Sequence, residues 1–441
     1  MKNRKYMILG FITALGFFSF ALAPSLLAKE EVSSDKPTVE ASRLQSLAKF
    51  TKVLGIVERY NVDEITIEEI MDKALQGLMT NLDAHSSYLS TKSFENLKIQ
   101  TNGEFGGLGI TVGMRDGALT VIAPIEGTPA DKAGLKASDI ILRIDGESSL
   151  NMTIDDAVNV MRGKPGTPIM LTIVRKGESE PLEIKIIRDI IKIQSVYAKQ
   201  IGENILYIRV TSFDKKVVED VTKELKKHRG HDKGIILDLR NNPGGLLDQS
   251  VGLVDLFIDE GDIVSQKGRD ASEDRVFSAS SSNTITDAPL VVMINEGSAS
   301  ASEIVSGALQ DHKRAVLLGQ KTFGKGSVQV ILPITDSEAI KLTIARYYLP
   351  SGRTIQAVGV TPDINVVAGE IKTHENKFRI KESDLKKHLE SELEKIDDNA
   401  TSPTIEGEDD NKTVITEEMM QKDIQLKEAV DIVKALIIVK G

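Results

Sequence analysis

The sequence predicts an α/β protein with a small β-rich domain inserted between helical ends. Two continuous apolar runs, GIILDLR at 234–240 and PLVVMIN at 289–295, are typical of strands buried on both faces of a sheet. Residues 103–178 hold several short β-rich segments and one helix-like segment. Near both ends of the chain, apolar side chains recur at helical spacing instead. A chain of 441 residues is long enough for roughly two to four domains.

Composition excludes several classes of function. A hydrophobic content of 41% and a charged content of 27% are typical of a soluble globular protein. The net charge of −10, with no long basic run, argues against a nucleic-acid partner. The absence of cysteine excludes disulfides, thiolate metal sites and a cysteine nucleophile. No H-E-x-x-H or comparable ligand spacing occurs, so we expect neither a metal nor a cofactor.

The first 28 residues are typical of an export signal. Three basic residues precede the apolar run YMILGFITALGFFSFALA, and signal peptidase could cut after ALA (21–23) or LLA (26–28). We expect cleavage, although a run of about 18 apolar residues could instead stay as a membrane anchor. Both alternatives predict a protein of the periplasm or of the outer face of the cytoplasmic membrane. A flexible polar leader then covers residues 29–41.

An N-terminal helical region is expected over residues 42–100. Its second helix begins after Thr66, because Glu69 three residues later completes a capping box. The region is either a helical hairpin packed on its own core or an arm for interaction or dimerisation. The apolar stripe of its first helix comprises Leu44, Leu47, Phe50, Leu54 and Val57.

A C-terminal helical region is expected over residues 369–441. Residues 396–412 are acidic and lack an apolar period, so they form a linker within this region. The helix that follows the linker carries one apolar stripe: Leu426, Ala429, Val430, Val433 and Ile437.

The β-rich domain has four expected strands and one expected helix. The strands are LGITV, LTVIAPI, DIILRIDG and IMLTIVR. The helix begins after Thr153, which forms a capping box with Asp156. One face of this helix carries Ile154, Ala157, Val158 and Met161.

A serine-rich loop is the first candidate for chemistry. In INEGSASASEIVSGALQDH, three serines alternate with alanines between a buried strand and a helix. Small residues let a substrate backbone approach, and a helix N-terminus stabilises developing negative charge. The alternative is purely structural, because Ser and Ala also suit tight packing and Ser is a common N-cap. A serine nucleophile therefore needs a base before it is convincing.

No histidine is well placed to be that base. His312 lies about three helical turns, or roughly 18 Å, beyond the serines, and His85 belongs to another region of the chain. Lys325 is the other option, since it lies between two glycines in a nearly uncharged, extended segment. Burial would lower its pKa toward neutrality, and Gln329 would share its face of the strand. A surface hairpin lysine is the alternative.

Several motifs together resemble the carboxy-terminal processing proteases. NEGSASASEIVSGALQDH, GQKTFGKGSVQ, LDLRNNPGGLL and YYLPSGRTIQ are similar to the peptidase motifs of that family. FGGLGITV and TPADKAGLKASDIILRIDG resemble the PDZ domain that these enzymes carry. LDAHSSYLS resembles their N-terminal signature, with Ala84 where the family usually has proline. The resemblance extends from about residue 42 to residue 365.

The resemblance implies both an architecture and a catalytic site. It implies a PDZ domain at 101–185 inserted before a serine peptidase core at 186–368, with the ββα arrangement of crotonases and Clp proteases. It places the nucleophile at Ser300, the general base at Lys325 and an assisting glutamine at Gln329. Cleavage would proceed through an acyl-enzyme, and Ser298 and Ser302 would be caps and packing residues.

The resemblance also implies an oxyanion hole. One donor is the N–H of Ala301, which helix-terminus physics also favours. The second donor comes from the NNPGG loop, where the sequence leaves Gly244 and Gly245 as alternatives.

A PDZ domain implies capture of a protein tail. The tail would add as a strand, with its carboxylate on the backbone of a Gly-Leu-Gly-Ile loop. Arg162 is a candidate for a contact that gates the proteolytic site, although it could simply complement a helix dipole. The expected peptide-binding residues are Gly107, Leu108, Gly109, Ile110, Ala157 and Met161.

These features predict an exported serine endopeptidase that acts on proteins with apolar C-termini. We also expect a homo-oligomer, a dimer or larger, and allow for an adaptor protein. One alternative is a PDZ scaffold without peptidase activity, which intact Ser300, Lys325 and Gln329 argue against. The other is an acyl-CoA enzyme, which export and the PDZ-like segment argue against.

Overall fold

The computed structural model describes residues 39–115, 117–150, 152–230, 233–370 and 415–440. The predicted signal at 1–28, most of the leader and the acidic linker lie outside the described residues. The chain divides into two compact units, residues 1–73 and 74–441. Within the described part of the chain, no helix combines the length and the apolar character needed to cross a membrane.

The first unit contains α1 (Val39–Tyr60) and the start of α2 (Ile67–Thr80). The predicted capping box is present, since the Thr66 N–H donates to the Glu69 carboxylate at 3.0 Å and the Glu69 N–H donates to Thr66 Oγ1 at 3.2 Å. The apolar stripe of α1 is exposed, with Leu44 at 68% and Leu47 at 55%. Leu44 and Leu47 are therefore not packed in a core of the described residues.

All four strands expected in the PDZ-like segment are present. They lie in an antiparallel sheet with the order β3-β4-β5-β7-β8, in which β6 pairs with β5. Helix α5 begins after the predicted capping box of Thr153 and Asp156. The elements are β3 (Ile110–Arg115), β4 (Ala118–Pro124), α4 (Pro129–Lys132), β5 (Ile140–Ile144), β6 (Glu147–Ser148), α5 (Ile154–Met161), β7 (Pro168–Val174) and β8 (Leu182–Ile187).

The main sheet of the larger α/β domain has the order β10-β11-β12-β15-β16-β19. Strand β10 is antiparallel to its neighbour, and the other pairs are parallel. Every residue of β12 and β15 is buried, as their continuous apolar runs predict. The strands are β10 (Val196–Ile201), β11 (Ile205–Val210), β12 (Gly234–Asp238), β15 (Leu290–Ile294), β16 (Val316–Gly319) and β19 (Ile364–Asn365).

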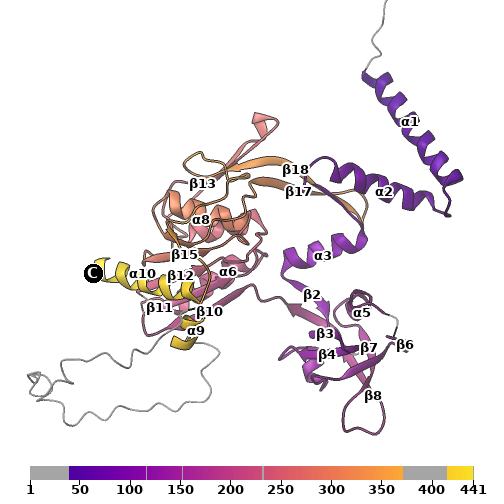
Figure 1. Cartoon of the computed structure of the whole chain (residues 1–441), viewed down its shortest axis with the longest axis horizontal. Helices are drawn as coiled ribbons and strands as arrows, with labels where there is room; N and C mark the ends of the chain where they lie inside the picture. Colours follow the sequence, from indigo (N-terminus) through magenta and orange to yellow (C-terminus); the bar gives the residue numbers. More distant parts are fainter. Residues whose placement is uncertain (1–38, 116, 151, 231–232, 371–414, 441) are drawn as a thin grey trace, which may run out of the picture. The chain divides into compact units, whose positions relative to one another are not determined.

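Helices cover both faces of this sheet (Figure 1). Alternate residues of β12 point to opposite faces of the sheet. Ile235 and Leu237 pack with α6, α7 and α8, whereas Ile236 packs with the C-terminal helix α10. The stripe predicted for α10 is buried from Leu426 to Val433. The helices are α6 (Val217–Lys227), α7 (Leu247–Asp255), α8 (Ala301–Asp311), α9 (Glu417–Gln421) and α10 (Ile424–Lys440).

A second sheet brings the N-terminal signature beside the hairpin of β17 and β18. Strand β18 pairs with β17, β13 and the short strand β1, and β14 pairs with β13. Helix α3 (Thr91–Asn102) follows β1, and β2 (Glu104–Gly107) pairs with β9 (Asp189–Lys192) in a separate ribbon. The strands of the second sheet are β1 (Ser87–Leu89), β13 (Asp262–Gly268), β14 (Arg275–Ser278), β17 (Ser327–Pro333) and β18 (Ala339–Tyr348).

Candidate active site

The serine loop forms a strained turn between β15 and α8. Ser300 is the N-cap of α8 and has φ of +55°, a conformation that costs a non-glycine residue about 1–3 kcal/mol. Ser300 is partly exposed, whereas Ser298 and Ser302 are fully buried. The Ser298 hydroxyl donates to the Leu239 carbonyl (2.8 Å) and the Ser302 hydroxyl to the Asn242 carbonyl (2.9 Å). The turn therefore presents Ser300 alone of the three to solvent.

The fully buried carboxylate of Glu303 links the serine turn to the lysine loop. Its Oε2 accepts the N–H of Ser300 and the N–H of Lys325, both at 2.8 Å. Its Oε1 accepts the Thr322 hydroxyl at 2.5 Å and the Gly324 N–H at 2.7 Å. Four donors thus fix two loops that are more than twenty residues apart in the sequence.

Glu303 was not among the predicted site residues. Its signal is nevertheless in the sequence, because Ser300 followed by Glu303 three residues later is a capping-box pattern. What the sequence could not show is that the carboxylate also reaches Thr322, Gly324 and Lys325.

Lys325 is half-buried in the loop between β16 and β17. Burial lowers the pKa of Lys325, the charge of Lys341 lowers it further, and Glu303 opposes the shift. Among the described residues, Lys325 Nζ has no hydrogen-bond or ion-pair partner, and so it is not bonded to the Ser300 hydroxyl. The predicted strand alternation does not apply to Lys325, because β17 begins only at Ser327. The backbone bond to Glu303 tethers it instead.

The NNPGG loop lies against the serine turn. A Cβ on Gly244 would be 2.9 Å from Ser300 Cβ, so only glycine permits this approach. The Gly244 N–H already donates to Asn242 Oδ1 at 2.9 Å. The N–H groups of Gly245 and Ala301, in contrast, have no acceptor in the part of the chain that the structure describes.

An ionic cluster anchors the start of the NNPGG loop. Asp238 is fully buried at the end of β12, where it accepts the Tyr207 hydroxyl (2.7 Å) and pairs with Arg240 (2.7 Å). Arg240 also binds Asp423 (2.8 Å) and Gln425 (3.0 Å) from the C-terminal segment. Burial opposes the charge of Arg240, but hydrogen bonds to Asp238 and Asp423 raise its pKa. The sequence predicted a C-terminal helix but not its contact with this loop.

The N-terminal signature lies near the candidate base. The pKa of His85 is lowered by burial and then by the positive charge of Lys325. His85 does belong to another region of the sequence, but the fold brings it close enough to Lys325 for the two charges to interact. The register of β1 against β18, which pairs Ser87 with Lys341, brings this segment to the lysine.

The Gly107–Ile110 loop connects β2 to β3 of the PDZ-like domain. Gly109 has φ of +77°, and a Cβ there would lie 2.3 Å from Thr128 Cβ, so the position requires glycine. Among the described residues, the N–H groups of Leu108 and Gly109 have no acceptor. Two neighbouring free donors are suited to a carboxylate.

The helix residues predicted to bind a peptide are placed differently. Ala157 is 0% exposed and Met161 is 4% exposed, and both pack in the core of the PDZ-like domain. Their expected contacts with a peptide are therefore replaced by a packing role. On the same face of α5, Ile154 is exposed and Val158 is partly exposed.

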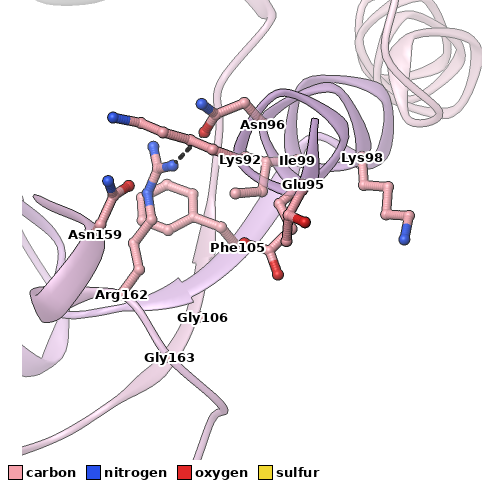
Figure 2. A pocket seen from close by; sticks show the side chains of 11 residues that line it. Lys92, Glu95, Asn96, Lys98, Ile99, Phe105, Gly106, Asn159, Arg162 and Gly163 are labelled. Carbon is pink, nitrogen blue, oxygen red and sulfur yellow. Dashed lines mark hydrogen bonds between the residues drawn. The ribbon is translucent and has the colours of Figure 1, made fainter. Parts of the chain in front are cut away.

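Arg162 caps the C-terminal end of α5 and faces a pocket of about 530 Å³ (Figure 2). Its Nη1 donates to Asn96 Oδ1 of α3 at 2.7 Å, and its guanidinium lies 5.1 Å from the ring centre of Phe105. Arg162 thus connects the PDZ-like domain to α3, beyond any effect on the dipole of α5. The pocket is lined by Thr91, Lys92, Glu95, Asn96, Lys98, Ile99, Phe105, Gly106, Asn159, Arg162 and Gly163.

Two segments of the chain match known protein families. Residues 204–366 match the model of peptidase family S41, and residues 120–175 match a PDZ domain model. The chain is 42% identical to a carboxy-terminal-processing protease of Bartonella bacilliformis, over 80% of this chain and 83% of that protein. It is 33% identical to the carboxy-terminal processing protease CtpA of Bacillus subtilis, over 72% and 69% respectively. A solved photosystem II D1 C-terminal processing protease aligns with a TM-score of 0.42 and 26% identity, over 73% and 92% respectively.

Proposed function

We propose that this chain, which belongs to the carboxy-terminal processing proteases of peptidase family S41, serine peptidases with a PDZ domain, is an exported enzyme that cleaves proteins with a Ser300–Lys325 dyad. The observation that carries this proposal is the buried Glu303 carboxylate, which binds the N–H of Ser300 and the N–H of Lys325 at 2.8 Å each. One rigid group thereby fixes both backbones, and fixed geometry is what a dyad requires.

In the proposed reaction, Ser300 Oγ attacks the scissile carbonyl while neutral Lys325 takes the hydroxyl proton. Lys325 returns this proton to the leaving amine, and an acyl-enzyme remains on Ser300. A water molecule then attacks the ester carbonyl while Lys325 again accepts a proton. Lys325 returns this proton to Ser300 Oγ as the ester bond breaks, which releases the acid product and restores the free hydroxyl. Gln329 orients the lysine amine in both steps.

The oxyanion would be stabilised by the N–H groups of Ala301 and Gly245. The serine turn offers the first donor, at the N-terminus of α8. The choice of Gly245 over Gly244 follows from the bond that already commits the Gly244 N–H to Asn242.

Substrate capture would use the backbone of the Gly107–Ile110 loop and the exposed part of α5. A protein with an apolar C-terminus would place its carboxylate on the N–H groups of Leu108 and Gly109. The contact between Arg162 and Asn96 supports a gating role for Arg162, because it connects the tail-binding domain to α3.

Export, self-association and an adaptor protein complete the proposal. The basic and apolar N-terminal sequence supports export to the periplasm or the outer face of the cytoplasmic membrane. The exposed apolar stripe of α1 supports an N-terminal arm for homo-oligomerisation.

Cleavage by matched serine variants tests the proposal. Residues 29–441 would be purified as wild type, Ser300→Ala and Ser302→Ala, and incubated with an unfolded protein that has an apolar C-terminus. Mass spectrometry should find fragments with wild type and Ser302→Ala, but none with Ser300→Ala. Cleavage by Ser300→Ala would refute the assignment of the nucleophile. Binding of the tail without cleavage by wild type would favour the scaffold alternative or a missing adaptor.

A further inference from the structure

A chain of hydrogen bonds connects the N-terminal signature to the amide of Gln329. Asp83 Oδ1 accepts the Thr343 hydroxyl at 3.1 Å, and Thr343 Oγ1 lies 3.4 Å from Gln329 Nε2. The same amide nitrogen lies 2.8 Å from Ser327 Oγ. Asp83 comes from the turn before β1, Thr343 from β18 and Gln329 from β17, so the chain of bonds crosses three segments.

Asp83 is held as a carboxylate by its other neighbours. It accepts the backbone N–H of His85 (2.8 Å), the backbone N–H of Ser86 (2.9 Å) and the Ser86 hydroxyl (2.6 Å). Burial alone would raise the pKa of Asp83, but the hydrogen bonds from Ser86, His85 and Thr343 lower it to about 2. At neutral pH Asp83 can therefore only accept hydrogen bonds.

This restriction fixes the direction of every bond in the chain. Because Asp83 only accepts, the Thr343 hydroxyl must donate its proton to Asp83. The Thr343 oxygen is then an acceptor, so the NH₂ end of the Gln329 amide must face it. The amide oxygen Oε1 is left at the opposite end, and among the described residues it has no donor.

We propose that Asp83 is a positioning residue that, through Thr343, turns the Gln329 carbonyl oxygen toward the amine of Lys325. The proposal rests on the proposed Ser300–Lys325 dyad and assigns a task to the LDAHSSYLS motif. Without the chain of bonds, the amide could rotate by half a turn and present its NH₂ group to the lysine instead. That NH₂ group would then donate to the lone pair of the neutral amine, which is the pair that must accept the Ser300 proton.

The test is a mutant series at Thr343 in the full mature chain. Thr343→Val keeps the shape of the side chain and removes the hydroxyl. We expect kcat to fall about tenfold and KM to change by less than about twofold. The loss in kcat is smaller than the roughly 100-fold or more that a general base contributes, because the lysine itself is still present. Thr343→Ser should restore most of the activity. Tyr88→Phe is the matched control, because it also removes one hydroxyl, which donates to Glu338 between β17 and β18.

A double-mutant comparison separates positioning from a structural role. In a Gln329→Ala background, Thr343→Val should change kcat by less than about twofold, because the amide that Thr343 orients is gone. An equal loss in both backgrounds would overturn the proposal, as would a change in KM alone. Asp83→Asn, with thermal unfolding measured alongside, tests the same point if Thr343→Val does not fold.

The result also distinguishes this proposal from the proposed function. If Ser300→Ala and Lys325→Ala abolish cleavage but Thr343→Val is fully active, only the positioning role of Asp83 is wrong. If Ser300→Ala still cleaves, the dyad is wrong and the positioning role is overturned with it.

Discussion

Two helices of this chain begin with the same local motif in very different surroundings. At α5, Thr153 and Asp156 exchange hydrogen bonds of 3.2 and 3.1 Å, and both residues are exposed. At α8, Ser300 and Glu303 form the equivalent box, but Glu303 is fully buried and binds three further donors. The motif that only starts a helix in the PDZ domain joins the serine turn to the lysine loop in the peptidase core.

The NNPGG loop and the Gly107–Ile110 loop also differ in what holds them in place. In the peptidase core, the NNPGG loop follows an ionic cluster in which buried Asp238 and partly exposed Asp423 both bind Arg240. In the PDZ domain, the Gly107–Ile110 loop is held by backbone bonds, such as the one from the Ile125 N–H to the Gly109 carbonyl (2.9 Å). A site that stabilises a transition state needs rigid dipoles, whereas a site that accepts varied tails needs only a strand edge and donors.

The largest effect is expected for Glu303→Gln. In the wild-type chain, both carboxylate oxygens of Glu303 accept hydrogen bonds. The glutamine side chain would place an NH₂ group against some of those donors, so the serine turn and the lysine loop should separate. We expect kcat to fall by at least about 100-fold, comparable to the loss of an oxyanion donor. Asp156→Asn, the same change in the exposed box, should leave kcat unaltered. If steady-state kinetics show the same loss of kcat for both variants, burial of Glu303 is not what makes its capping box important.

The pH dependence of cleavage should separate the two domains. Lys325 acts as a base only when neutral, and burial lowers its pKa below the ordinary lysine value. Well below that pKa, kcat/KM should rise about tenfold for each pH unit. Binding of a tail to Ser300→Ala protein, followed by fluorescence anisotropy, should be nearly flat over the same range. An acid optimum for cleavage would contradict a neutral lysine base.

Asp423→Asn tests whether the ionic cluster stabilises the core. Burial opposes ionisation of Asp423, but hydrogen bonds from Arg240 lower its pKa in the folded chain. Its contribution is therefore present above the unfolded-state pKa of about 4, and it is lost as the pH falls through the lower folded-state value. At pH 7 we expect the free energy of unfolding to drop by about 2 kcal/mol. Denaturant unfolding at pH 7 and pH 3 should show the gap closing in acid.

The sequence was sufficient for the strands marked by apolar runs and for the peptidase and PDZ segments marked by motifs, because these depend on local patterns. The runs at 234–240 and 289–295 became the buried strands β12 and β15 as predicted. Contacts between distant segments could not be predicted from the sequence. The reach of Glu303 to the lysine loop, the bond from Arg240 to Asp423 and the nearness of His85 to Lys325 all depend on tertiary packing.

Gly109→Ala should affect recognition but not chemistry. Gly109 has φ of +77°, and a Cβ there would meet Thr128 at 2.3 Å, which would displace the loop. We expect KM for substrates with an apolar tail to rise about tenfold, equivalent to about 1.4 kcal/mol. A short peptide without such a tail should be cleaved at the wild-type rate. Gly127→Ala is the matched control, since its φ is +76° but no atom lies within 4 Å of the new Cβ.

The smallest effect is expected for the contact between Arg162 and Asn96, which connects the PDZ domain to α3. Arg162→Ala and Asn96→Ala each remove the 2.7 Å bond between α5 and α3, which is partly exposed and contributes about 1 kcal/mol. Each should change the ratio of tail-stimulated to basal cleavage by up to about fivefold, and the double variant should match the single ones. The direction of the change identifies which conformation the bond stabilises. If both ratios equal that of wild type, the bond only joins neighbouring elements, and Arg162 does not gate the peptidase site.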